Sequence, residues 1–599
     1  MFRYLDFLCL ASFVSDLEFR ASDLKKMDIR QKIQNSIIAS LQNLDIDTPE
    51  VSLEHPDNIE NGDYSTNVAL VLAKELKIKP RELADKILAE LLKNKPEEIS
   101  EIGVAGAGFI NFYLSPQFFA DSVKEILDKK ENYGKTENLA GKKIMVDYTD
   151  PNPFKEFHIG HLMSNAIGES LCRIFEVNGG GVVRVCYQGD VGLHVAKAIW
   201  GILADKNNFP SDQASLSEKI AFLGKAYVWG SQKYEEDEKI VGEIKDLNKK
   251  IFEKSDPEIN EIYEKGRRWS MDHFDEIYKK LGTQFDHFIP ESSVLEDGLQ
   301  IVKEFLKKGV FEESQGAVVF KGETYGLHTR VFINSQGLPT YETKDLGLAK
   351  KKMDLEKGLS LSLVVTANEQ NDYFKVVLKA LEFIFPEYSK IAGHLGHGML
   401  RFATGKMSSR KGNVITGESL ISAVEAMVHK KIADREIMTA EKNKIAECVA
   451  IGAIKYSILK QSIGSDIIYD FEKSISFEGD SGPYIQYAYT RARSVLEKAH
   501  NSDLIGSVDF GSPQTVGNLE KILYRFPEIA ERAGKEYAPH YIATYLIELA
   551  SVFNNYYANN KIVDKENPEA PYRVALTEAV SIVLKNGLYL LGIIAPQRM

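Results

Sequence analysis

The segment KKIMVDYTDPNPFKEFHIGH (residues 142–161) decides the fold of the central part of this chain. Its first eight residues predict a buried strand, the Pro-Asn-Pro turn at 151–153 ends that strand, and a helix is expected to begin near His161. Further strands are predicted at VVRVCYQ (182–188), LPTYET (338–343) and LSLVVTA (361–367), with helical stretches between them. Strands that alternate with helices indicate a parallel, doubly wound sheet whose ligand lies beyond the carboxyl ends of the strands.

The region from 27 to 139 predicts a separate N-terminal α/β domain. DIRQKIQNSIIASLQNL (28–44) repeats apolar residues every four positions, which favours one buried helical face. Two more helices are expected on either side of the break at Lys79-Pro80, because proline disfavours helix in the residue before it. FINFYLS (109–115) alternates as a strand.

Residues 1–26 fit neither of these regions. FLCLASFV (7–14) is weakly similar to the core of a secretory signal, but Asp6 precedes it and no small-x-small cleavage site follows. We expect instead that this extension reflects an upstream start codon and that the working protein begins at Met27. Export remains the alternative.

The central domain is expected to span 140–418, with a charged helical insertion at about 205–286 packed beside the sheet. The alternative is that the insertion is a solvated helical arm without a functional role. From 419 to 599, long amphipathic stretches such as SGPYIQYAYTRARSVLEKA (481–499) repeat apolar residues at three and four positions. They predict an all-helical C-terminal domain.

Composition excludes several classes of protein. The 599 residues are 44% hydrophobic and 27% charged, which is typical of a globular protein rather than a disordered or collagen-like one. No apolar run is long enough to cross a bilayer, and four scattered cysteines favour the reducing cytoplasm over a disulfide scaffold. The net charge of −12 excludes a simple basic nucleic-acid coat, although a local basic groove could still hold RNA.

The tetrapeptide HIGH (158–161) is the first candidate for chemistry. Two imidazoles, His158 and His161, flank Gly160 at a helix start, where free backbone N–H groups attract phosphate and glycine lets a nucleotide approach. The same spacing could hold zinc, but no third ligand follows at a suitable spacing. Taken alone, the tetrapeptide could equally have a structural role.

GKMSSRKGNVIT (405–416) is the second candidate. Lys406, Arg410 and Lys411 lie among glycines and serines, a composition suited to a loop that closes over phosphate. By itself such a loop is more often a solvated turn. The order of the two motifs, one after the first strand of the sheet and one after the last, favours a nucleotide site.

Together these motifs resemble the HIGH and KMSKS signatures of class I aminoacyl-tRNA synthetases. GDYSTNVALVLAKELK (62–77), AGAGFINFYLS (105–115), PTYETKDLGLAKKK (339–352) and LYLLGIIAPQRM (588–599) extend the resemblance to the arginyl-tRNA synthetase family, over about 27–599. The resemblance implies a multidomain α/β protein with a class I Rossmann-like catalytic domain, an N-terminal tRNA-contacting α/β domain and a C-terminal all-α anticodon-binding bundle. Two departures are KMSSR in place of KMSKS, and Ala107 where relatives usually have proline.

The resemblance also implies a role for each motif residue. The residues expected to bind arginine are Asp150, Pro151, Asn152, His161, Tyr341, Asp345 and Gln370. Those expected to bind ATP are His158, Gly160, His161, Lys406, Met407, Ser408 and Ser409. Lys155, His158, His161, Lys406 and Arg410 are expected to neutralise phosphate charge during catalysis, with Lys155 compensating for the lysine missing from the loop. The pairing of Asp345 with a planar guanidinium is chemically reasonable, whereas the alternative for Tyr341 and Asp345 is a strand end followed by a helix cap.

The implied partners are tRNA(Arg), L-arginine and ATP, with Mg²⁺ carried by ATP and no metal bound by the protein alone. Anticodon contacts are expected from Tyr484, Gln486, Tyr487 and Arg491, although tyrosines on a helix face are more often core residues. A cytoplasmic monomer without membrane contact is expected. The alternatives are a nucleotidylyltransferase of the same fold, a catalytically silent RNA-binding paralogue, and the cysteine-specific synthetase, whose zinc ligands this sequence lacks.

Overall fold

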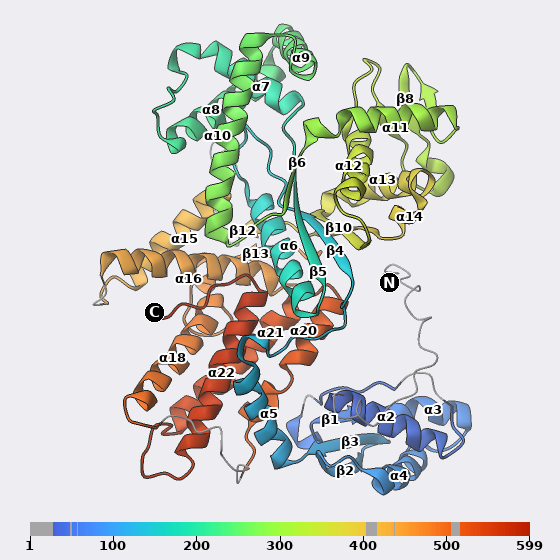
Figure 1. Cartoon of the computed structure of the whole chain (residues 1–599), viewed down its shortest axis with the longest axis vertical. Helices are drawn as coiled ribbons and strands as arrows, with labels where there is room; N and C mark the ends of the chain where they lie inside the picture. The colour runs from blue at the N-terminus through green and yellow to red at the C-terminus, as the bar shows by residue number, and fades with distance from the viewer. Residues whose placement is uncertain (1–27, 48–50, 57, 403–415, 436–437, 505–514) are drawn as a thin grey trace. The chain divides into compact units, whose positions relative to one another are not determined.

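The computed structural model describes residues 28–47, 51–56, 58–402, 416–435, 438–504 and 515–599 (Figure 1). These residues form two compact units. The first comprises 28–125 with 515–524, and the second comprises 126–504 with 525–599. Residues 515–524 therefore cluster with the N-terminal part of the chain, although they lie within the region assigned above to the C-terminal domain.

The first unit packs helices on a small antiparallel sheet. Its strands β1 (Tyr64–Thr66), β2 (Ile99–Ala105) and β3 (Phe109–Leu114) have the order β1-β3-β2. Helices α2 (Ile29–Gln42), α3 (Val68–Leu76) and α4 (Pro80–Leu91) supply the apolar faces, and α19 (Asn518–Leu523) belongs to the same unit. The side chain of Asp28 caps α2, and the four-residue apolar repeat is buried as predicted. The predicted break before Pro80 is also confirmed.

A five-stranded parallel sheet forms the centre of the second unit. Its strands are β4 (Lys143–Tyr148), β5 (Gly181–Gln188), β6 (His287–Pro290), β10 (Leu359–Ala367) and β11 (Ala392–His397), in the order β11-β10-β4-β5-β6. The chain adds strands on one side of β4 and then returns to the other, so the order reverses between β4 and β10. In such sheets, the crevice beyond the carboxyl ends of these two strands is the expected ligand site.

Helices connect and cover these strands. They are α6 (Ile159–Val177), α7 (Leu193–Ala204), α11 (Leu295–Lys307), α12 (Tyr341–Leu355), α13 (Asn371–Ile384) and α14 (Pro386–Ser389). Helix α5 (Pro116–Lys129), which precedes β4, belongs mainly to the first unit. The predicted insertion forms α8 (Leu216–Glu236), α9 (Glu238–Glu253) and α10 (Pro257–Leu281). It shares a hydrophobic core with α7, so it is packed rather than a solvated arm.

One predicted strand is wrong. LPTYET (338–343) contains β-forming residues, but only Pro339 and Thr340 are extended, where they pair with β9 (Arg330–Ile333). Helix α12 begins at Tyr341, because Thr340 is its extended N-cap and helix-forming residues follow. Strand β9 belongs to a small antiparallel sheet with β7 (Glu312–Ser314) and β8 (Ala317–Phe320).

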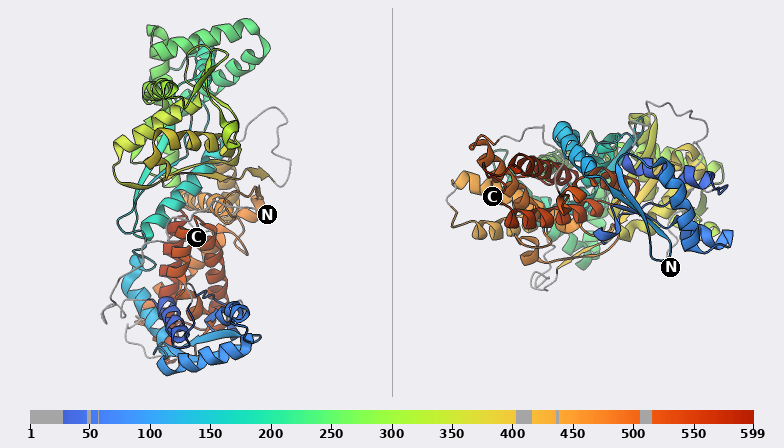
Figure 2. Two further views of the ribbon diagram at one scale, coloured as in Figure 1. Left: turned by 90° about the vertical axis from the view of Figure 1, so that its right-hand side faces the viewer. Right: turned by 90° about the horizontal axis from the view of Figure 1, so that it is seen from below.

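The C-terminal half of the second unit is helical, as predicted. Its helices are α15 (Gly417–Lys431), α16 (Thr439–Leu459), α17 (Phe471–Ser474), α18 (Gly482–His500), α20 (Phe526–Lys535), α21 (His540–Asn559) and α22 (Ala570–Leu590). The two short strands β12 (Leu400–Phe402) and β13 (Ile467–Tyr469) pair beside them. The red helices α21 and α22 lie side by side in Figures 1 and 2, and α6 packs against α16, α20 and α22. No helix in the described ranges is long and apolar enough to span a membrane.

Candidate active site

A cavity of about 490 Å³ opens beyond the carboxyl ends of β4 and β10. Five of the seven residues expected to bind arginine line it together: Asp150, Asn152, Tyr341, Asp345 and Gln370. They come from three separate segments, after β4, on α12 and after β10. Pro151 is buried outside the cavity lining, and His161 lies in the adjoining first turn of α6.

The turn after β4 has an unusual backbone. Thr149 and Asp150 have positive φ values of 82° and 47°, a region that residues other than glycine seldom adopt. The backbone N–H of Tyr187 donates to the Asp150 carboxylate at 2.8 Å, which fixes this side chain beside β5. Burial, and then the charge of Asp147, raises the pKa of Asp150 well above its ordinary value.

Asn152 reaches the cavity because residue 189 is glycine. A Cβ on Gly189 would lie 2.2 Å from Asn152 Oδ1 and 3.1 Å from Glu291 Oε2. The carbonyl of Gly189 contacts His194 Nε2 at 2.7 Å, which anchors this bend. The absent side chain therefore gives space to two polar groups of the site.

Tyr341 and Asp345 lie one turn apart on α12. Tyr341 is 62% exposed at the rim, whereas Asp345 lies deeper and accepts a hydrogen bond from the hydroxyl of Tyr373 at 2.5 Å. Burial raises the pKa of Asp345 to about 7, against the opposing effect of the Tyr373 hydrogen bond. The helix cap proposed above as an alternative for these two residues does not apply, because both lie within α12.

Apart from Glu369, which is exposed, the remaining charged groups of the cavity are paired. Lys352 on α12 donates to Asp147 at 2.5 Å, and Lys344 forms a buried ion pair with Glu291. No lysine or arginine is paired with Asp150 or Asp345 among the described residues. In the same part of the structure, Asp147 Oδ1 and the hydroxyl of Tyr187 are buried without a hydrogen-bond partner. The cavity thus presents two unpaired carboxyls and spare polar atoms, which suits a cation with several donors.

The histidines of HIGH form the start of α6. His158 is its N-cap, and its Nδ1 accepts from the N–H of Gly160 at 3.2 Å, while His161 Nδ1 accepts from the N–H of His158 at 3.3 Å. Both rings are stacked, with centroids 3.5 Å apart. Because each Nδ1 is an acceptor, each neutral ring carries its proton on Nε2, where it remains a donor.

Both imidazoles are neutral. Burial, followed by the positive charge of Lys155, lowers the pKa of His158 to about 4. Burial also lowers the pKa of His161 well below its ordinary value, helped by His158 and Lys155. These rings can donate hydrogen bonds to phosphate oxygens, but they carry no charge at neutral pH in this state. In this ligand-free site, the positive charge next to HIGH is therefore that of Lys155.

Three family models match this chain in order. The model described as "Arginyl tRNA synthetase N terminal domain" matches residues 28–114, "tRNA synthetases class I (R), catalytic domain" matches 122–471, and "DALR anticodon binding domain" matches 485–599.

The chain belongs to the arginyl-tRNA synthetase family.

Relatives of this family match the chain over nearly its full length. The arginine–tRNA ligase of Streptococcus suis (strain 05ZYH33) is 33% identical over 594 residues, and that of Clostridium acetobutylicum is 30% identical over 580 residues; each match covers 96% of this chain and 100% of the relative. The arginyl-tRNA synthetase structure from Thermus thermophilus has a TM-score of 0.78 at 24% identity, covering 96% of this chain and 100% of that one. The predicted fold class is confirmed.

The loop motif of this family member lies outside the described residues. Lys406, Met407, Ser408, Ser409 and Arg410 all fall in 403–415. Its C-terminal flank, however, is placed: Thr416 pairs with His158 in an antiparallel bridge, and the N–H of Gly417 donates to the carbonyl of Phe157 at 2.7 Å. The residues that directly follow the loop therefore lie beside the start of the HIGH helix α6.

Lys155 lies between the cavity and the insertion. Its Nζ is 5.0 Å from the ring centroid of Tyr227 on α8, and its charge reaches both HIGH histidines. A cation therefore lies near the two HIGH histidines. Among the described residues, no group of three or more His, Cys, Asp or Glu could hold a metal ion.

The four residues expected to contact the anticodon differ in their surroundings. Tyr484, Tyr487 and Arg491 are half-buried on α18, and the Arg491 guanidinium lies 4.7 Å from the Tyr487 ring centroid. Gln486 is fully buried and donates to the carbonyl of Ile594 at 2.8 Å. The structure leaves no surface of Gln486 for RNA, which corrects that expectation.

Several site residues were missed from the sequence. They are Asp147, Tyr187, Glu291, Lys344, Lys352 and Tyr373. Two signals could have found some of them: Asp147 interrupts an otherwise apolar strand, and Lys352 follows Asp345 by seven residues, on the same face of α12. No local pattern marks Glu291, whose partner is more than 50 residues away.

Proposed function

We propose that this chain is an arginine–tRNA ligase. It activates L-arginine with ATP to form arginyl-adenylate and pyrophosphate, and then transfers arginine to the 3′ end of tRNA(Arg), releasing AMP. The observation that carries this function is the pair of buried carboxyls, Asp150 and Asp345, left without a cationic partner in a cavity beside HIGH. Membership of the arginyl-tRNA synthetase family supports the same conclusion.

The cavity holds arginine through its side chain. Asp345 accepts the guanidinium, Tyr341 covers it from the rim, and Asn152 and Gln370 hold the polar groups at the other end of the substrate. A lysine substrate has a compact ammonium that cannot supply the guanidinium's planar set of donors, so it would leave polar atoms of the cavity unpaired. This discrimination needs no separate editing site.

Phosphate charge and phosphate hydrogen bonding are divided between different residues. His158 and His161 donate from Nε2, while Lys155, Lys406 and Arg410 supply positive charge, with Mg²⁺ arriving on ATP. Gly160, Met407, Ser408 and Ser409 complete the nucleotide site. The arginine carboxylate attacks the α-phosphorus, the bond to the β-phosphate oxygen breaks, and pyrophosphate leaves with that electron pair.

The second step brings RNA to the same site. A terminal ribose hydroxyl attacks the adenylate carbonyl, and AMP leaves. Tyr484, Tyr487 and Arg491 on α18 offer aromatic and cationic groups on which unstacked anticodon bases can stack. The N-terminal domain (27–139), the catalytic domain (140–418) and the C-terminal domain (419–599) act together on one tRNA, in a cytoplasmic monomer.

The deciding experiment is ATP–pyrophosphate exchange with each of the twenty amino acids, with and without tRNA. Exchange stimulated by arginine alone among them supports the function. Exchange with cysteine, or with no amino acid while a nucleotide acceptor is consumed, would overturn it in favour of the cysteine-specific enzyme or a nucleotidylyltransferase. Sedimentation of the full chain tests the monomer separately.

A further inference from the structure

A buried chain of hydrogen bonds connects the C-terminal helices to the cavity. It starts at Lys455 on α16, which is 1% exposed. Its Nζ donates to the carbonyl of Leu281, the last residue of α10, at 2.6 Å, and to that of Gly592, after α22, at 2.8 Å. Lys455 therefore ties the end of the insertion to the terminal segment of the chain.

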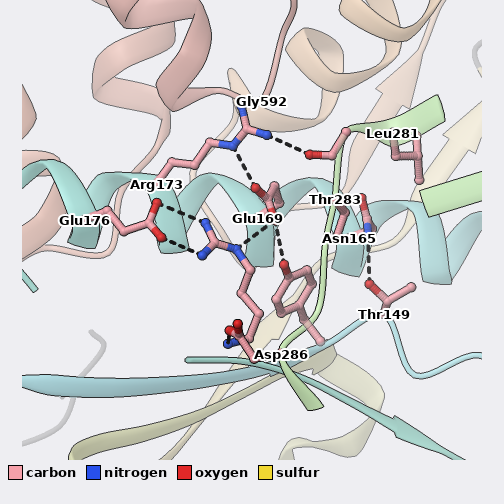
Figure 3. Close-up of polar contacts among 12 residues, drawn as sticks. Thr149, Asn165, Glu169, Arg173, Glu176, Leu281, Thr283, Asp286 and Gly592 are labelled. Atoms are coloured by element: carbon pink, nitrogen blue, oxygen red, sulfur yellow. Dashed lines mark hydrogen bonds and ion pairs between the residues drawn. The ribbon is translucent and has the colours of Figure 1, made fainter. Parts of the chain in front are cut away.

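The segment after α10 is in turn hydrogen-bonded to α6. The hydroxyl of Thr283 donates to Asn165 Oδ1 at 3.1 Å, and Asn165 Nδ2 donates to the hydroxyl of Thr149 at 3.0 Å (Figure 3). All three side chains are at least 94% buried. Arg173 on α6 also donates to the carbonyl of Gly282 at 2.7 Å, so the backbone between Leu281 and Thr283 is held from both sides.

The last residue of this chain belongs to the strained turn of the cavity. A positive φ is unfavourable for a β-branched residue such as Thr149, so the surroundings must hold the turn in place. Ser164 Oγ accepts from the N–H of Thr149 at 3.0 Å, and Asn165 holds its hydroxyl. Asp150 and Asn152 follow directly, so the turn decides where both side chains enter the cavity.

We propose that Lys455, Thr283 and Asn165 are positioning residues for arginine binding, through which the C-terminal helices hold the Thr149–Asp150 turn. The proposal rests on the arginine-binding function proposed above. None of the three lines the cavity, so each acts through Thr149 and not on the substrate.

Ser170 provides a matched control. It lies on α6, is fully buried, and donates to the carbonyl of Leu590 at 2.8 Å. Its hydrogen bond also joins α6 to the C-terminal segment, but it has no link to Thr149. A merely structural role for the network predicts similar behaviour for changes at Ser170 and Thr283, whereas a positioning role separates them.

The experiment compares Thr283→Val, Thr283→Ser and Ser170→Ala in the full-length chain. Arginine Kd is measured by calorimetry, the KM values of arginine and ATP by pyrophosphate exchange with tRNA present, and stability by Tm. Loss of the neutral, buried hydrogen bond from Thr283 to Asn165, the residue that holds the Thr149 hydroxyl, should weaken arginine binding about fivefold. We expect this for Thr283→Val with an unchanged KM for ATP, near wild-type binding for Thr283→Ser, and a lower Tm with arginine Kd within twofold for Ser170→Ala.

A double variant tests the connection to the C-terminal helices. Lys455→Met should also weaken arginine binding. The double variant Lys455→Met with Thr283→Val should have an arginine Kd no higher than that of the more affected single variant, because both changes interrupt one chain of hydrogen bonds. The proposal is overturned if Thr283→Val leaves arginine Kd unchanged, or if Ser170→Ala weakens it equally; the Thr283 pair decides this whether or not Lys455→Met folds. A wild-type chain that binds no arginine would instead overturn the function itself.

Discussion

Arginine binding should depend on pH through Asp345. Burial raises the pKa of this carboxyl to about 7 in the ligand-free site, so it is largely protonated at pH 6 and ionised at pH 8. The guanidinium binds the ionised form, and a proton therefore competes with arginine whenever the pH lies below that pKa. The affinity for arginine therefore falls as the pH falls, and it levels off above about pH 8.

The size of the effect comes from the fraction ionised. With a pKa of about 7, that fraction is about 0.09 at pH 6 and about 0.9 at pH 8, so the arginine Kd should be about tenfold weaker at pH 6, or roughly 1.4 kcal/mol. Binding at pH 6 should release about one proton, and at pH 8 almost none. Calorimetry in two buffers of different ionisation enthalpy measures both quantities.

Asp345→Asn separates this carboxyl from the others. The amide keeps the shape but not the charge, which should cost about 1.5–3 kcal/mol of arginine binding and raise the KM for arginine far more than that for ATP. The variant should also lose the pH slope, whereas Glu369→Gln, at an exposed carboxyl of the same cavity, should keep it. An unchanged KM for arginine, or a slope that survives in Asp345→Asn, would refute the reasoning.

The remaining predictions concern other parts of the chain. Gly189→Ala should raise the KM for arginine about tenfold, because the new Cβ would displace the Asn152 side chain and would also lie 3.1 Å from Glu291 Oε2; an unchanged KM would contradict this. Pyrophosphate exchange should stay near background until tRNA is added, because the loop lacks the second lysine of its signature and closure needs the RNA; strong exchange without RNA would disprove this dependence. A chain that starts at Met27 should keep its aminoacylation rate and Tm, and a large loss of either would show that 1–26 are structural. Gln486→Leu should lower the free energy of unfolding by about 1–3 kcal/mol, and with it Tm, by leaving the Ile594 carbonyl unsatisfied, while tRNA affinity stays intact. Tyr487→Ala should weaken tRNA binding with little change in Tm; equal loss of affinity in both variants would contradict the burial argument.

Much of the fold was predictable because its signals are local. Short apolar runs mark β4, β5 and β10, and the proline that begins α4 marks the start of that helix. Once parallel strands are assigned, their carboxyl ends indicate where the site lies, whereas Asn152 and Gln370 were singled out by the family resemblance; both line the cavity. Tyr341 and Asp345 lie one turn apart on α12, so both line the cavity even though the strand predicted at 338–343 was wrong.

The rest depended on contacts between distant segments. Lys352 and Asp147 are 205 residues apart, and no periodicity connects them. Gln486 and Tyr487 are neighbours, but the packing of α18 against the terminal segment buries the first and leaves the second half-exposed. The neutral state of His158 was equally hidden, because it results from burial and the nearby Lys155 rather than from residue type.

These long-range pairs explain why the cavity selects a guanidinium. Lys344 and Lys352 already neutralise Glu291 and Asp147 from within the protein, so the cavity does not offer four free charges to any cation. Apart from the exposed Glu369, what remains is Asp150 and Asp345, the latter with a pKa near 7 that records how poorly its charge is solvated, together with uncompensated polar atoms. An ammonium could satisfy one charge but not the surrounding acceptors, whereas a planar guanidinium distributes five donors over them. The selectivity therefore arises from which acceptors the protein's own lysines leave unpaired, not from the number of acidic residues in the cavity.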